Sequence, residues 1–123
     1  MNTEKFKNIR LKYKIWLEDE QETSIMGDGK YHLLKAIENE GSLMAAIEKQ
    51  NLDYRRTWGN LKKIEKTLGF PLLEKTRGGK DGGKTVLTKD GKKLLLAFEN
   101  FHGKMDKIFN EAFIEFHMIL QMV

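Results

Sequence analysis

The feature that most constrains the fold is the C-terminal part of the chain, where a helical pattern covers residues 88–123 without a proline. Thr88 is a suitable N-cap, and Asp90 in the first turn suits the positive end of the helix dipole. At 1.5 Å per residue this helix would be about 50 Å long. The whole chain has 123 residues, which is the size of one domain. The rest of the chain must therefore be built around this helix.

Two apolar rows follow this helix at four-three spacing, and a domain this small cannot bury both of them. We therefore expect the distal half to pack against the same helix of a second subunit, in a two-fold symmetric dimer. Folding back over its own domain is the alternative. The residues predicted at the dimer interface are Phe98, Phe101, Met105, Ile108, Phe109, Ala112, Phe113, Phe116 and Leu120.

Basic residues are concentrated in the middle of the chain. Residues 54–93 contain twelve Lys or Arg and four Asp or Glu, whereas the net charge of the whole chain is only +4. A local basic excess on a modest total indicates a surface for a polyanion, most often nucleic acid. A lysine-rich solvated face is the alternative reading.

Two helices are predicted before the most basic segment. Residues 30–40 place apolar side chains on one helical face until Gly41 ends the helix. Ser42 is a good N-cap for a short second helix at 43–50. Asn51 then tolerates the left-handed backbone of the turn that follows.

A third helix is predicted at 54–68, capped by Asp53. Its inward stripe comprises Trp58, Leu61, Ile64 or Glu65, and Leu68. Its outward face carries Tyr54, Arg55, Arg56, Asn60, Lys62 and Lys63. Two helices joined by a few residues, the second with a basic outer face, are typical of a DNA-binding helix-turn-helix. A plain antiparallel helical hairpin is the alternative.

Strands are predicted on both sides of this helical unit. Apolar and polar residues alternate at 11–18, which indicates a half-buried strand, and the polar stretch 18–29 that follows reads as a loop. Glycines at 78–83 separate two short strand candidates, so residues 72–88 read as a hairpin. A hairpin after a helix-turn-helix is a wing. The first strand could pair with it as a third strand.

The stretch 78–85, "GGKDGGKT", matches the spacing of a nucleotide-binding phosphate loop. That loop must follow a buried strand and open a helix, whose N-terminal amides hold the phosphates. Here Val86 and Leu87 extend a strand instead. No nucleophile has a base beside it, so we predict no enzyme and no catalytic residue.

Metal and membrane functions have little support. The chain has no cysteine, and His32, His102 and His117 are scattered. Glu99 and His102 have the spacing of di-iron helical bundles, but that motif occurs once where such sites need more carboxylates. There is no signal peptide and no apolar run of the roughly 20 residues needed to cross a bilayer. We expect a cytoplasmic protein without metal or cofactor.

Two blocks of sequence, "GSLMAAIEKQNLDYRRTWGNLKKIE" and "LGFPLLEKTRGGKDGGKTVLTKDGKKLL", together resemble the N-terminal DNA-binding domain of ModE, the molybdate-responsive transcription regulators. The winged helix of that domain is in turn similar to that of LysR-type regulators. The family's tyrosine, basic residue and tryptophan correspond to Tyr54, Arg55 and Trp58. Its glycine-rich wing, Leu-Thr pair and glycine correspond to residues 78–83, Leu87, Thr88 and Gly91.

The chain also departs from the family. Ala46 and Ile47 stand where paired alanines are usual, Asn51 where glycine is usual, and Asp53 where serine is usual. Full-length members continue into a molybdate-binding domain, for which these 123 residues leave no room. We therefore expect no molybdate sensing by this chain.

Together these features predict a mainly α fold with a small β-sheet: a winged helix-turn-helix at 1–93 with an N-terminal strand, and a long dimerisation helix at 89–123. The predicted function is sequence-specific binding of double-stranded DNA by a dimeric transcription regulator. The third helix would enter the major groove and the wing would meet phosphates or the minor groove. The predicted DNA-binding residues are Tyr54, Arg55, Arg56, Asn60, Lys63, Arg77, Lys80 and Lys84. A protein-interaction adaptor is the main alternative.

Overall fold

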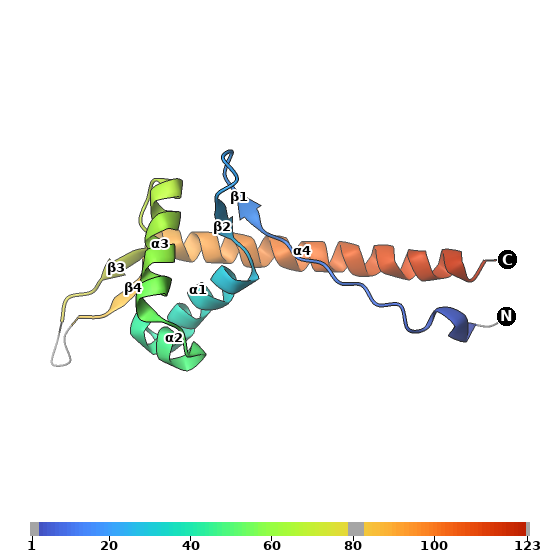
Figure 1. The fold of residues 1–123 in the computed structure, drawn as a ribbon, viewed down its shortest axis with the longest axis horizontal. Helices are drawn as coiled ribbons and strands as arrows, with labels where there is room; N and C mark the ends of the chain where they lie inside the picture. The colour runs from blue at the N-terminus through green and yellow to red at the C-terminus, as the bar shows by residue number, and fades with distance from the viewer. Residues whose placement is uncertain (1–2, 79–82, 123) are drawn as a thin grey trace.

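The computed structural model describes residues 3–78 and 83–122 and shows a mainly helical chain with two small antiparallel sheets (Figure 1). This agrees with the predicted α+β class. After a 3-10 helix, η1 (Thr3–Phe6), the strands are β1 (Leu17–Glu18), β2 (Ser24–Met26), β3 (Leu73–Lys75) and β4 (Thr85–Leu87). The helices are α1 (Asp28–Glu40), α2 (Leu43–Gln50), α3 (Tyr54–Leu68) and α4 (Lys89–Leu120).

Helix α1 begins at Asp28, in a stretch predicted to be a loop, and without a side-chain cap; the other ends of the first three helices follow local sequence signals, as predicted. Gly41 ends α1 with φ 89°, and Asn51 ends α2 in the left-handed region with φ 53°. The Ser42 hydroxyl accepts a hydrogen bond from the Ala45 amide, and the Asp53 carboxylate accepts one from the Arg56 amide. Each bond satisfies an amide that would otherwise lack an intrahelical partner.

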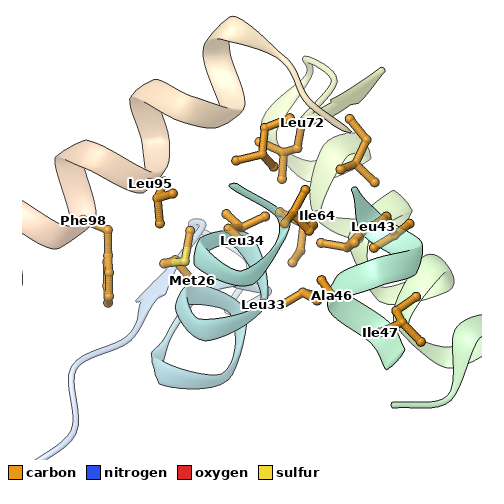
Figure 2. Packing of buried hydrophobic residues seen from close by; sticks show 14 residues of the cluster. Met26, Leu33, Leu34, Leu43, Ala46, Ile47, Ile64, Leu72, Leu95 and Phe98 are labelled. Atoms are coloured by element: carbon orange, nitrogen blue, oxygen red, sulfur yellow. The ribbon is translucent and has the colours of Figure 1, made fainter. Parts of the chain in front are cut away.

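The core lies where α1, α2, α3 and the first part of α4 meet (Figure 2). Met26 from β2, Leu34 from α1, Ala46 from α2 and Ile64 from α3 all contribute to it. Leu95 and Phe98 of α4 complete this cluster, so the core reaches beyond the boundary predicted at residue 93. The amphipathic helices thus bury their apolar stripes against one another.

Helix α4 is the long rod that the sequence predicts, and its distal part projects beyond the other helices (Figure 1). It does not fold back over its own domain. Phe98 was predicted at a dimer interface, but it is only 2% exposed and packs in the core of its own domain. Its ring lies 5.8 Å from the Tyr31 ring of α1, because this turn of α4 faces α1.

The prediction for the N-terminal strand was wrong. Regular strand covers only Leu17–Glu18, and it pairs with β2, from a stretch predicted to be a loop. Residues 9–16, which we call the N-terminal strap, run beside α4: the Tyr13 ring lies 4.5 Å from that of Phe109, and the Tyr13 hydroxyl donates a hydrogen bond to Asp106. The strap therefore lies against a helix and not within a sheet, and its Leu11 and Tyr13 side chains stay 40% and 37% exposed.

The predicted hairpin at 72–88 is confirmed in its two strands. β3 pairs with β4 in register, Leu73 opposite Leu87 and Lys75 opposite Thr85. This pair forms its own sheet, separate from β1 and β2, so the predicted third strand is absent from the described part of the hairpin. The molecule thus has two small hairpins, one on each side of α3 in the view of Figure 1.

Candidate nucleic-acid interface

Helix α3 presents a polar, positively charged face to solvent. Thr57, Leu61 and Ile64 are buried on its inner side, so the positions between them point outward. Four predicted DNA-binding residues are exposed there, and their side chains have no hydrogen bond or ion pair to other described residues. These are Arg55, Arg56, Asn60 and Lys63. Their donors are therefore available to a ligand.

Tyr54, the fifth predicted residue on this helix, belongs to a small aromatic stack. Its ring lies parallel to that of Trp58, with centroids 6.3 Å apart. Trp58, predicted to be core, is half-buried at the edge of the core. The Lys62 ammonium lies 4.4 Å from the Trp58 ring centroid and 3.0 Å from Glu65 Oε1. Lys62 is therefore engaged by the protein, unlike its basic neighbours on α3.

Glu65 is the residue that fixes the β3–β4 hairpin against α3. Its buried Oε2 accepts hydrogen bonds from the amides of Leu72 and Leu73 at 2.6 and 3.0 Å. Burial opposes ionisation, but the two amides and Lys62 together outweigh it and hold the pKa of Glu65 below its ordinary value. The hydrophobic pattern left open whether Ile64 or Glu65 belongs to the inward stripe of α3, and both side chains are buried.

The hairpin is fixed against α4 by Thr88 and Gly91. The Thr88 hydroxyl donates to the Pro71 carbonyl at 2.7 Å and accepts from the Gly91 amide at 2.9 Å. A Cβ at Gly91 would lie 2.5 Å from the Leu72 carbonyl oxygen, so only glycine permits this close approach. We call Glu65, Thr88 and Gly91 the hairpin clamp, because they hold the start of the β3–β4 hairpin. The family resemblance pointed to Thr88 and Gly91, whereas nothing local in the sequence pointed to Glu65.

Beyond the clamp, the two arms of the hairpin are linked by Thr76 and Lys84. The Thr76 amide donates to the Lys84 carbonyl at 2.7 Å, and the Thr76 hydroxyl accepts from the Lys84 amide at 3.0 Å. A Cβ at Gly83 would lie 2.6 Å from the Thr76 carbonyl oxygen. Arg77 and Lys84 are exposed on the arms, while Lys80 lies outside the described residues. The clamp and this link present two basic side chains in fixed relation to α3.

The remaining predicted dimer residues differ in exposure. Leu11 and Tyr13 of the strap line an apolar hollow of about 370 Å³ together with Phe109, Ala112, Phe113 and Phe116 of α4. Phe109 and Phe113 are half-buried. Met105 and Leu120 are also half-buried. The other four, all exposed, are Phe101, Ile108, Ala112 and Phe116. Most of the exposed apolar surface of α4 therefore lies on the part of the helix beyond Phe98, its last core residue.

The alternative chemistries have little geometric support. Glu99 is hydrogen-bonded to the Tyr31 hydroxyl at 2.7 Å and paired with Lys35 at 3.1 Å, while His102 Nδ1 lies 3.0 Å from Asp106. Within residues 3–78 and 83–122, no group of three or more His, Asp or Glu side chains is placed to hold a metal ion. In the same part of the chain, no helix is both long and apolar enough to span a membrane.

Comparison with known proteins shows similarity to ModE and Mop proteins. The chain is 31% identical over 98 residues to the transcriptional regulator ModE of Haemophilus influenzae, covering 80% of this chain and 35% of that protein. It is 37% identical over 73 residues to the molybdenum-pterin-binding protein MopB of Rhodobacter capsulatus, covering 59% of this chain and 27% of that protein. No protein-family model matches.

A third relative carries DNA binding in its name. The DNA-binding transcriptional dual regulator ModE of Escherichia coli K12 is 30% identical over 67 residues, which cover 54% of this chain and 26% of that protein. The chain thus spans about a quarter to a third of the length of these curated relatives. Two of the three relatives are thus named as transcriptional regulators and the third as a molybdenum-pterin-binding protein.

Proposed function

We propose that the protein is a dimeric winged-helix transcription regulator of the ModE type that binds specific sequences in double-stranded DNA. The observation that carries this proposal is the hairpin clamp, because it holds a basic hairpin against a helix on which Arg55, Arg56 and Lys63 have no partner among the described residues. Similarity to two proteins named as transcriptional regulators, one of them as DNA-binding, supports it. The same proposal places the protein in the cytoplasm, where bacterial DNA lies.

Helix α3 would read base edges in the major groove. In helix-turn-helix proteins the N-terminal residues of the second helix reach the bases, and Tyr54, Arg55 and Arg56 occupy the first turn of α3. Arginine can donate two parallel hydrogen bonds to guanine, whereas asparagine suits adenine, so Arg55, Arg56 and Asn60 suit base reading. Lys63 lies further along the helix and would approach a phosphate.

The hairpin would serve as the wing. Arg77 and Lys84 are exposed on its arms, and Lys80 belongs to its tip sequence. The wing would meet phosphates or enter the minor groove, where glycine permits close approach of the backbone. Its contribution would be largely independent of base sequence.

Two copies would associate through the distal part of α4. A two-fold axis along this helix would bury Phe101, Ile108 and Phe116, which are exposed in one chain. The paired modules would then recognise an inverted repeat, with half-sites separated by whole turns of the duplex. Phe109 and Phe113, beneath the strap, would line the edge of this interface.

Salt-dependent binding of variants tests the division of roles. Arg55→Ala or Arg56→Ala should change sequence preference and cost about 1–3 kcal/mol on the preferred site. Lys84→Ala should instead weaken binding to every duplex alike and reduce the slope of log affinity against log salt by about one. Duplexes selected from a random pool supply the preferred site, and the solution mass of the protein reports the dimer.

Lys104→Ala is a matched control, because it removes one exposed cation from α4 at a distance from α3. Equal losses on every sequence from Arg55→Ala and Lys84→Ala would contradict base reading by α3. Weak binding of the wild-type protein to all duplexes would favour the protein-interaction adaptor instead. A monomer mass would contradict the role of α4.

A further inference from the structure

The β1–β2 hairpin carries negative charge beside the positively charged helix α3. Its turn has the sequence "EDEQE" at 18–22. Glu18, Asp19 and Glu20 line an open hollow of about 790 Å³ together with Lys63 and Lys66. Glu22 lines a second hollow, of about 480 Å³, together with Asn60 and Lys63. Lys63 therefore has carboxylates on two sides.

Hydrogen bonds hold two of these carboxylates in place. The Asp19 carboxylate accepts the amides of Gln21 and Thr23 at 2.9 and 2.8 Å, and the Asp19 amide donates to the Thr23 carbonyl at 3.0 Å. Glu18 accepts a hydrogen bond from the Trp16 indole at 2.8 Å. Two of the four carboxylates of the turn are thus held by hydrogen bonds, and the backbone of the turn is held by Asp19.

Glu22 carries its charge at a conformational cost. Its φ is 65°, in the left-handed region that glycine and asparagine adopt most readily. A turn selected for geometry alone would favour one of those residues here. The turn instead holds a carboxylate beside Asn60 and Lys63.

The two ends of α3 therefore differ in charge environment. Figure 1 shows the β1–β2 hairpin standing beside the C-terminal end of α3, while the β3–β4 hairpin projects on the other side of the helix. Among the described residues, neither Lys63 nor Lys66 forms a close ion pair with the turn. The carboxylates act on them at longer range, where they lower the local positive potential and repel a phosphate.

We infer that the β1–β2 turn is an electrostatic stop that sets the limit of the DNA footprint on α3. Phosphates would be attracted most strongly to the first turns of α3 and to the wing, and more weakly to Lys63 and Lys66, whose positive potential the turn reduces. The turn would thereby fix the angle at which α3 enters the major groove and reduce binding to unrelated duplexes. This inference rests on the proposed function.

The test removes the charge without changing the shape of the turn. Glu20→Gln combined with Glu22→Gln should raise affinity for random duplex about 3- to 10-fold at 0.1 M salt and steepen the salt slope by up to about one. The gain should shrink as salt rises, because the interaction is long-range. Lys63→Ala should weaken binding more in this double variant than in the wild-type protein.

Glu111→Gln combined with Glu115→Gln is the matched control, because it makes the same change of net charge on the distal part of α4. It should change affinity less than about 2-fold. Equal gains from both pairs, no gain from the turn pair, or an unchanged effect of Lys63→Ala would overturn the inference. A wild-type protein that binds no duplex would overturn the proposed function, and this inference with it.

Discussion

Two small antiparallel hairpins flank the same helix, yet they are held in different ways. The β3–β4 hairpin is fixed by side chains from outside it, through Glu65 of α3 and through Thr88 and Gly91 at the start of α4. The β1–β2 hairpin has its polar hydrogen bonds within its own turn, through Asp19, while Met26 of β2 is buried in the core. The difference lies in the polar attachments, which come from neighbouring helices for one hairpin and from its own turn for the other.

The two hairpins also differ in charge. The β3–β4 hairpin carries Arg77 and Lys84 on its arms, whereas the β1–β2 hairpin carries four carboxylates in its turn. A ligand with negative charge is therefore attracted to one side of α3 and repelled from the other. Changing the attachment of one hairpin should alter stability, and changing the charge of the other should alter binding.

Glu65→Ala should give the largest loss of stability. It leaves the buried amides of Leu72 and Leu73 without an acceptor, and each orphaned amide costs about 1–3 kcal/mol. Urea denaturation would measure the loss. Thr67→Ala is the control, because its hydroxyl donates only to the exposed Lys63 carbonyl within the same helix. An equal loss from the two variants would show that the hairpin is held by something other than Glu65.

Glu65 also predicts a pH dependence. Because its pKa is lower in the folded protein than in the unfolded chain, the stability it contributes is fully present above the unfolded pKa and is lost as pH falls through the folded pKa. Glu65→Gln should flatten the fall of unfolding free energy in acid. Some dependence should remain, because hydrogen bonds from Tyr31 and Tyr13 lower the pKa values of Glu99 and Asp106.

Gly91→Ala should destabilise the protein by about 1–3 kcal/mol, because the new methyl group meets the Leu72 carbonyl oxygen. Gly103→Ala is the matched control on the same helix. Its Cβ would meet nothing, so replacing a glycine in the helix interior should stabilise the protein by about 1 kcal/mol. The opposite signs are measurable in one set of denaturation curves. A loss from both variants would contradict the close approach at Gly91.

Local signals predicted the helix ends, and long-range partners decided the rest. Ser42, Asn51 and Asp53 act on amides or backbone angles within three residues, so their roles were visible in the sequence. The alternation at 11–18 predicted a half-buried strand, but it could not show that the segment would lie against a helix with Leu11 and Tyr13 still exposed. The sequence likewise left open whether Ile64 or Glu65 faces inward. The hydrogen-bond partners that bury Glu65 come from β3 and the residue before it, and the pattern of α3 alone does not show them.

The same distinction applies to the candidate site. Arg55, Arg56 and Asn60 are outward because helical periodicity places them opposite a buried stripe. The acidic turn near Lys63 could not be found this way, since it read as a loop with no defined neighbour. Phe98 shows the converse error: its spacing fits the apolar row, but only the packing of α1 shows that it belongs to the core.

The smallest expected effect separates the charge of the β1–β2 turn from its conformation. Glu22→Gly should stabilise the protein by a few tenths to about 1 kcal/mol, because glycine adopts φ 65° without the cost that a side chain brings, less the entropy glycine gains when unfolded. Glu22→Gln should leave stability unchanged, since glutamine meets the same cost. Both variants remove one negative charge, so both should bind duplex DNA more tightly than the wild-type protein, and by the same factor. Tighter binding by the glycine variant alone would show that the shape of the turn, and not its charge, limits the footprint.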